Sequence, residues 1–129
     1  MYTVITYPEY LCLTTSIDDY QHLNGQYIRN TVGEKNYGFL GLYVSDKPNN
    51  CADTKYRIWK WDYEYNWGIT RAIGEFDYGE CGINPQLASD CNGEWVIGGT
   101  VRSQDEFQVI EGECLHGRIC LTCADPLLV

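Results

Sequence analysis

The sequence predicts an all-β protein stapled by disulfide bonds, either a sandwich or a twisted antiparallel meander of about 8–10 short strands. Apolar residues come in short alternating runs separated by turn residues, and helical periodicity is nearly absent. The 129 residues include 7 cysteines, a density typical of disulfide frameworks. In addition, 11 Tyr and 4 Trp supply large side chains for a core.

The N-terminal segment is expected to be a strand arm, residues 1–16, in front of a single β domain, residues 17–129, with a disulfide-tied C-terminal tail. Residues 2–7 are rich in β-branched and aromatic side chains, and a proline at position 8 separates them from the next strand. Such an arm can add to the sheet edge of a neighbouring copy. The residues expected to make that contact are Tyr2, Val4 and Thr6.

The rest of the chain is expected to be a series of hairpins. Residues 16–22 favour a short helical turn, and Asn24-Gly25 is the dipeptide preferred in type I′ turns, whose two central residues need positive φ. Strands are expected at residues 10–15, 26–32, 39–44, 55–61, 67–73, 95–101, 107–110 and 119–122. The expected turns and loops between them include residues 33–36, 45–54, 62–66 and 91–94.

Spacing favours some cysteine pairs over others. Cys81 and Cys91 bracket a turn-rich loop that a disulfide can close. Cys12 lies in an early apolar run, and a bridge to one of the three C-terminal cysteines would close a loop of roughly 100 residues, with an entropic effect on the order of 4–5 kcal/mol. Because the total is odd, one cysteine is left over, and Cys51 in a polar loop is the expected one. The expected disulfide cysteines are Cys12, Cys81, Cys91, Cys114, Cys120 and Cys123.

Cysteine usage and charge indicate an extracellular, secreted protein and exclude some partners. The first residues lack the basic segment that opens a signal peptide, so secretion would require that such a segment has been removed. With 18 acidic and 9 basic residues the net charge is −9, which argues against nucleic acid and disfavours an anionic membrane surface. No apolar run approaches the roughly 18 residues that span a bilayer, so no membrane insertion is expected.

Patterns for catalysis and metal binding are weak. The two histidines, His22 and His116, accompany no Gly-x-Ser-x-Gly elbow, and a Cys114–His116 pair would point to opposite faces of a strand. Cys120-x-x-Cys123 is interpreted as two half-cystines, because a zinc site formed with Cys114 and His116 lacks the spacing of a ribbon or finger. The carboxylate clusters fit no EF-hand and are interpreted as solvated surface, with calcium binding as an alternative. We expect no cofactor, no metal and no enzymatic activity, with a small hydrolase as the alternative.

Aromatic residues in and around the loop at residues 62–66 are the remaining binding signal. Tyr63 and Tyr65 alternate with acidic residues in this loop, between Trp61 and Trp67. Exposed Tyr and Trp side chains form platforms for sugar rings or protein partners. Trp61, Tyr63, Tyr65 and Trp67 are therefore the predicted binding residues, with burial in the core as the alternative.

Several short motifs resemble those of small disulfide-bonded β modules in the ectodomains of marine invertebrates and protists. They are Leu-Asn-Gly-Gln-Tyr at residues 23–27, Tyr-Arg-Ile-Trp-Lys-Trp at 56–61, Trp-Gly-Ile at 67–69, Trp-Val-Ile at 95–97 and a closing Cys114. The resemblance implies a disulfide-bonded β fold and carries no activity. The segments before and after these motifs depart from it.

Three classes of function are compatible with these features. The sequence favours an extracellular structural or adhesive module that self-assembles into a filament or matrix through its arm, with other copies of itself as partners. The second class is a glycan-binding, lectin-like module that uses the exposed aromatic residues, with an extracellular glycan or protein as partner. A small hydrolase ranks third.

Overall fold

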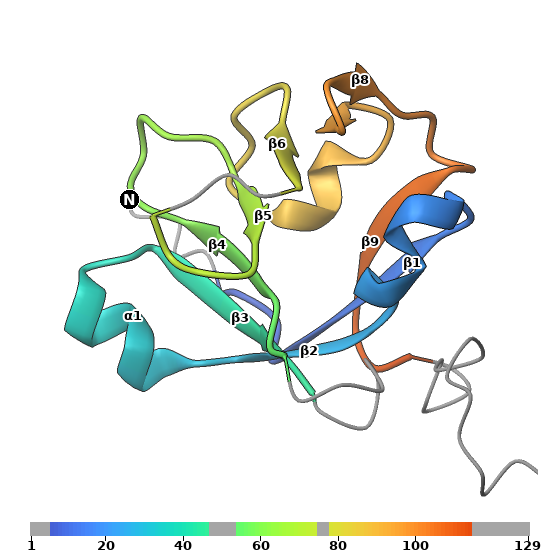
Figure 1. The fold of residues 1–129 in the computed structure, drawn as a ribbon. Coiled ribbons are helices and arrows are strands. Elements are labelled where there is room, and N and C mark those ends of the chain that lie inside the picture. The colour runs from blue at the N-terminus through green and yellow to red at the C-terminus, as the bar shows by residue number, and fades with distance from the viewer. Residues whose placement is uncertain (1–5, 47–53, 75–77, 115–129) are drawn as a thin grey trace, which may run out of the picture.

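The computed structural model describes residues 6–46, 54–74 and 78–114, and these form one antiparallel sheet with short helices between its strands (Figure 1). The strands are β1 (Tyr10–Thr15), β2 (Gly25–Arg29), β3 (Gly41–Ser45), β4 (Arg57–Lys60), β5 (Gly68–Thr70), β6 (Gly79–Cys81), β7 (Trp95–Ile97), β8 (Thr100–Val101) and β9 (Phe107–Glu111). The helices are η1 (Asp18–Leu23), α1 (Thr31–Tyr37) and η2 (Ala88–Cys91), of which η1 and η2 are 3₁₀ helices. The predicted all-β fold class is confirmed.

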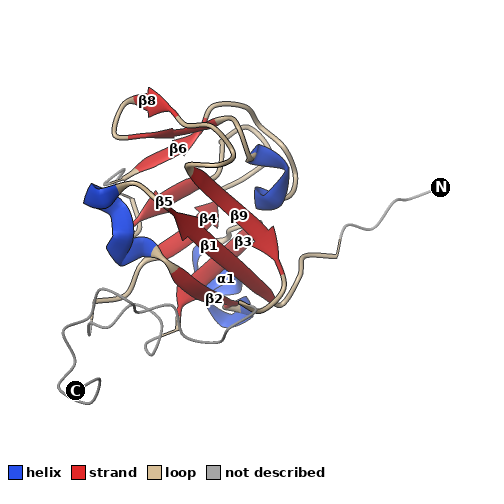
Figure 2. Ribbon diagram, turned by 90° about the vertical axis from the view of Figure 1, so that its right-hand side faces the viewer, coloured by secondary structure: helices blue, strands red, loops and turns tan. Residues whose placement is uncertain are grey.

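The strands follow one another as a meander in the order β8-β7-β6-β5-β4-β3-β2-β1-β9. Each strand from β2 to β8 pairs antiparallel with the one before it, and β9 returns to pair with β1. Figure 2 shows β9 and β1 side by side in the curled sheet. The register places Ile58 opposite both Tyr43 and Ile69, so apolar residues from three strands meet on one face.

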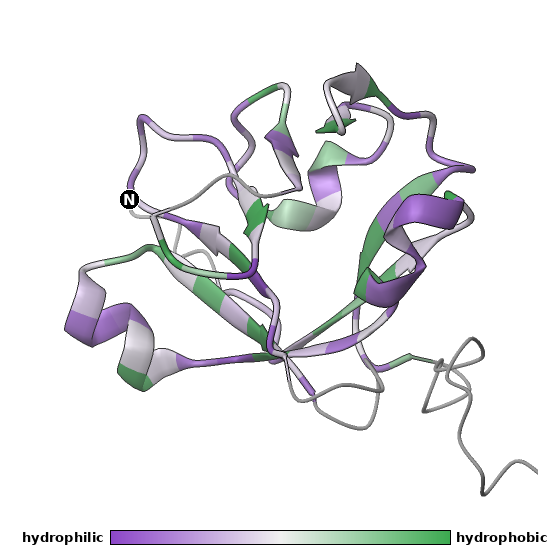
Figure 3. Ribbon diagram, viewed as in Figure 1, coloured by the Kyte–Doolittle hydropathy of each residue, from purple (hydrophilic) through white to green (hydrophobic). Residues whose placement is uncertain are grey.

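The curl encloses that face, and a single cluster of buried side chains extends from β1 to β9. Leu13, Ile58 and Ile97 are fully buried in it although they come from distant parts of the chain. Trp67 and Trp95 are its largest members. Figure 3 shows apolar residues along the strands and a largely hydrophilic η1. Burying a large apolar side chain contributes about 1.5–3 kcal/mol, so the inward residues of the alternating runs drive the closure.

Helix α1 replaces the turn expected at residues 33–36 and shortens the strand expected before it, so both predictions are wrong here. The helix begins after Asn30, whose Oδ1 accepts a hydrogen bond from the Gly33 N–H at 2.8 Å, and it ends at Gly38, which has a left-handed φ of 74°. A Cβ added to Gly33 would lie 2.6 Å from Leu42 Cδ2, so the helix sits directly on the outer face of β3. The two caps and this close contact outweigh the strand preference of its β-branched first residues.

Two expected turns also differ. Asn24 does not start a type I′ turn; its side chain pairs with the Thr15 backbone, accepting from the N–H at 2.6 Å and donating to the carbonyl at 3.2 Å. The connection from β1 to β2 is η1, which confirms the predicted helical turn. The strand expected at residues 95–101 is the β7–β8 hairpin, because Gly98 and Gly99 have φ of 65° and 80°, as a type I′ turn requires.

Two disulfides agree with the expected pairs. Cys81 is bonded to Cys91 across 10 residues, and Cys12 on β1 is bonded to Cys114, 102 residues away. Among the described cysteines none is free. The bond to Cys12 also removes Cys114 as a thiolate nucleophile or zinc ligand. The remaining three cysteines of the prediction, Cys51, Cys120 and Cys123, lie outside the described residues, as does the strand expected at 119–122.

The boundary expected after residue 16 is not present, because β1 lies inside the sheet between β2 and β9. The assembly residues Tyr2 and Val4 lie outside the described residues, and Thr6 is exposed and belongs to no strand. Tyr7 already packs on the domain, with its ring edge-on to Trp67 at 6.0 Å between centroids. Pro8 follows Tyr7, and its carbonyl accepts a hydrogen bond from the Tyr43 hydroxyl at 2.7 Å. From Tyr7 onward the chain therefore belongs to the domain.

Candidate functional site

Residues 61–66, between β4 and β5, form a loop that we call the aromatic loop. It carries three of the four predicted binding residues, and all three are exposed. The exposed fractions are 49% for Trp61, 72% for Tyr63 and 48% for Tyr65. The Trp61 and Tyr65 rings stack on each other, with centroids 5.0 Å apart and planes 23° apart. Trp67, the fourth predicted residue, is completely buried beneath Tyr7 and Tyr43, so the prediction that it binds at the surface is wrong.

Side chains from β4, from the segment after β6 and from the loop itself hold the aromatic loop in place. The Lys60 Nζ donates to the Tyr65 carbonyl at 2.5 Å and also to the Asn84 Oδ1. Asn84 Nδ2 in turn donates to the Tyr63 carbonyl at 2.7 Å. At the end of the loop, Asn66 Nδ2 donates to the Cys81 carbonyl at 2.9 Å. Because two loop carbonyls and the Asn66 side chain are held in this way, the exposed rings have a defined position before any ligand arrives.

Lys60 is the member of this network that the sequence analysis missed. Its side chain is only 2% exposed, and burial lowers the pKa of its amine, although the nearby Asp62 charge opposes that shift. A signal for it exists in the sequence: Lys60 falls on the same face of β4 as Ile58 in an alternating run. A lysine at a core-facing position needs polar partners nearby, and here they are the loop carbonyl and the Asn84 amide.

The Tyr7 side chain packs on Trp67, next to the end of the aromatic loop. Its pKa is raised, first by burial and then by the nearby Tyr63 hydroxyl and Glu34 carboxylate. The guanidinium of Arg29 lies over the Tyr7 ring at 5.3 Å, and Arg29 also forms a two-point ion pair with Glu34 at 2.9 Å. The positive charge of Arg29 is therefore engaged by Glu34 and Tyr7 of the same chain.

A second aromatic group lies near η1 and includes His22. The His22 ring is 5.4 Å from both Tyr56 and Tyr78, and Tyr20 is 6.4 Å from Tyr78. Burial lowers the pKa of His22, which favours the neutral imidazole. The four rings pack against one another and close one end of the core, so the group is interpreted as packing.

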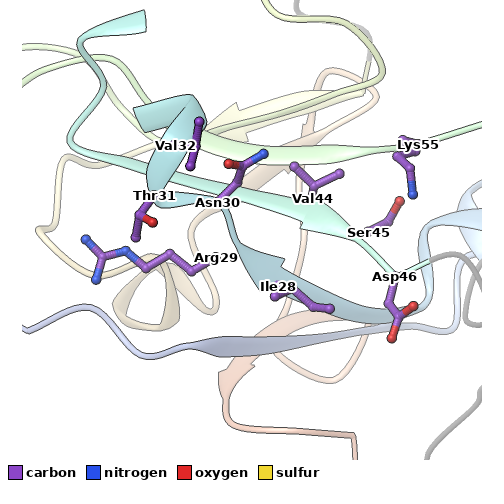
Figure 4. Close-up of a pocket in the computed structure, with 9 residues that line it drawn as sticks. All are labelled: Ile28, Arg29, Asn30, Thr31, Val32, Val44, Ser45, Asp46 and Lys55. Carbon is purple, nitrogen blue, oxygen red and sulfur yellow. The ribbon is translucent and has the colours of Figure 1, made fainter. Parts of the chain in front are cut away.

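An open groove of about 430 Å³ lies on the outer face of the sheet (Figure 4). It is lined by residues from β2, α1 and β3, among them the exposed Ile28 and Val32. Arg29 lines it too, but its guanidinium is already paired with Glu34. The groove therefore mixes apolar and polar side chains, Asp46 and Lys55 among them, and offers no unpaired guanidinium for an anion.

Metal binding and similarity to known proteins add no further site. In residues 6–46, 54–74 and 78–114, no three His, Cys, Asp or Glu side chains are grouped so as to hold a metal ion. No helix of the described part has both the length and the apolar character to cross a bilayer. No protein-family model, curated protein or solved structure matches the chain. The resemblance to invertebrate and protist β modules stays a prediction.

Proposed function

We propose that this chain is an extracellular carbohydrate-binding module that holds uncharged sugar rings against its aromatic loop. The observation that carries the proposal is the exposed Trp61–Tyr65 stack, anchored by the buried Lys60. Large rings that are half exposed and already fixed lose little conformational entropy when a ligand binds. A sugar ring presents a flat face of C–H groups, which packs on the outer face of such a ring.

Charge supports uncharged glycans over anionic ones. Asp62 and Glu64 flank the exposed Tyr63, and the whole chain carries a net charge of −9. Carboxylates accept hydrogen bonds from sugar hydroxyls but repel sulfates and other carboxylates. The amine of Lys60 is engaged by the loop and is not presented to a ligand.

Disulfides support the extracellular part of the proposal. Both described bonds are buried, with Cys81 and Cys91 inside the core cluster. Disulfides of this kind persist in oxidising compartments and are rare in the cytosol. The proposal therefore places the protein outside the reducing cell interior.

The test is retention on insoluble cellulose and chitin, together with affinity electrophoresis in soluble uncharged polysaccharides. Wild-type protein should be retained, and the Trp61→Ala/Tyr65→Ala variant should bind at least about tenfold more weakly, because loss of a central aromatic contact typically costs about 2 kcal/mol. Tyr37→Ala is the matched control: Tyr37 is 57% exposed, stacks on Phe39 at 5.3 Å and is not a residue of the aromatic loop. Equal binding by wild type and the double variant, or no retention of wild type on any of these polysaccharides, would reject the proposal.

Self-assembly through the N-terminal arm stays a prediction, because two of its three contact residues lie outside the described part. Strand β9 is one of the two edge strands to which an arm from another copy could add. Asn92 fills the outer edge of β9, accepting from the Val109 N–H at 2.8 Å and donating to the Val109 carbonyl at 2.9 Å. The Phe107 N–H on the same strand donates to the Ser103 carbonyl at 3.0 Å. These pairings at Phe107 and Val109 disfavour the addition of another strand at this part of the β9 edge.

A further inference from the structure

The contact between Lys60 and Asn84 joins two groups that can react with each other. Lys60 is the last residue of β4, and Asn84 follows β6, 24 positions later in the chain. The Lys60 Nζ touches the Asn84 carboxamide oxygen, so the amine is next to the carbon of that amide. Among the described carboxylates, none lies within ion-pair distance of Lys60.

The surroundings of Lys60 favour a nucleophilic amine. Its side chain is almost fully removed from solvent, and burial lowers its pKa, which increases the fraction of neutral amine. A neutral primary amine attacks carbonyl carbon, whereas an ammonium has no lone pair to use. The amine is held in place by its hydrogen bond to the Tyr65 carbonyl at 2.5 Å, so attack needs no search in solution.

The backbone of the aromatic loop also positions the leaving group. Asn84 Nδ2 donates to the Tyr63 carbonyl at 2.7 Å, which orients the nitrogen that would depart. The Tyr65 carbonyl can keep accepting the single N–H that an amide nitrogen retains.

We propose that Lys60 and Asn84 form an intramolecular isopeptide bond, made by the folded protein itself and releasing ammonia. In this reaction the Lys60 Nζ bonds to the Asn84 Cγ, and the bond from Cγ to Nδ2 breaks. One proton of Nζ is transferred to the departing nitrogen, which leaves as NH₃. The step neither oxidises nor reduces any group and consumes no other reactant. The product ties β4 to the segment after β6 and locks the aromatic loop, independently of what that loop binds.

The experiment is the intact mass of the purified, folded protein after denaturation and disulfide reduction. The expected mass is lower than the sequence mass by one ammonia, and digestion should yield a branched peptide that joins Lys60 to Asn84. A mass equal to that of the sequence, with both residues recovered in linear peptides, would overturn the proposal.

Two variants separate the cross-link from other losses of ammonia. Asn24-Gly25 and Asn92-Gly93 are sequences in which the following N–H can attack the asparagine and release ammonia, whereas Asn84 precedes Pro85, which has no N–H. Lys60→Arg and Asn84→Ala should each restore the mass expected from their own sequences, and Asn84 is exposed, so its variant should still fold. A deficit of one ammonia that persists in both variants would refute the assignment.

Discussion

Removal of the Cys12–Cys114 disulfide by the double substitution Cys12→Ala/Cys114→Ala should lower the free energy of unfolding by about 4–5 kcal/mol. The bond joins residues 102 positions apart and so constrains most of the unfolded chain. In the loop-entropy description a loop of about 100 residues is worth about 4.7 kcal/mol at 25 °C. Since single domains are stable by only about 5–15 kcal/mol, this loss is a large part of the total.

The Cys81–Cys91 disulfide provides an internal comparison. Its separation of 10 residues predicts an entropic effect of about 3 kcal/mol or slightly less. Because both sulfurs belong to the fully buried core, Cys81→Ala/Cys91→Ala also leaves voids that cost about 1 kcal/mol each. The two double variants therefore lose similar stability for different reasons. Only loss of the long cross-link lets the unfolded chain expand widely, so the denaturant m-value should rise most in Cys12→Ala/Cys114→Ala.

The assay is equilibrium unfolding in urea without reductant, followed by tryptophan fluorescence and circular dichroism. Peptide mapping should first establish that each variant keeps its other described disulfide. A loss below about 2 kcal/mol for Cys12→Ala/Cys114→Ala, with an unchanged m-value, would refute the argument that this bond acts on the unfolded chain.

Three further predictions concern single positions. Asn92→Ala should cost about 1–3 kcal/mol and promote concentration-dependent association by light scattering, because it leaves the Val109 backbone unpaired at the β9 edge; unchanged stability and mass would contradict this. Gly41→Ala should cost about 1–3 kcal/mol in thermal unfolding, because the added Cβ would lie 2.6 Å from the Trp67 Cη2; an unaltered melting temperature would count against the packing. Burial lowers the pKa of His22, so the unfolded chain takes up a proton at higher pH than the folded chain, and stability should fall as the pH drops below about 6.5. His22→Phe should flatten that decline between about pH 7 and 5.5, and equal slopes in both proteins would show that His22 is not its source.

Local signals in the sequence are sufficient to predict the strands in which apolar and polar residues alternate clearly. Residues 10–15 and 107–110 were expected as strands and form β1 and β9, because their inward apolar residues follow the two-residue period of a sheet. Cys81 and Cys91 were expected to pair because a short turn-rich segment separates them. By contrast, α1 depends on its contact with Leu42 on β3, which lies outside the helix, so the residues of the helix by themselves favour strand and turn.

What the sequence by itself determined is the β class, the positions of most strands and the existence of an aromatic loop, since these depend on alternation, turn residues and spacing along the chain. Tertiary structure alone decided which tryptophan at the ends of that loop is exposed. Trp61 and Trp67 look equivalent in sequence, but the curl of the sheet turns Trp67 inward under Tyr7 and leaves Trp61 outside. It also brought the Lys60 amine to Asn84, a contact between separate segments that no local pattern specifies. The direction of a side chain relative to the core depends on how the strands pair and curl, and that is a property of the whole sheet.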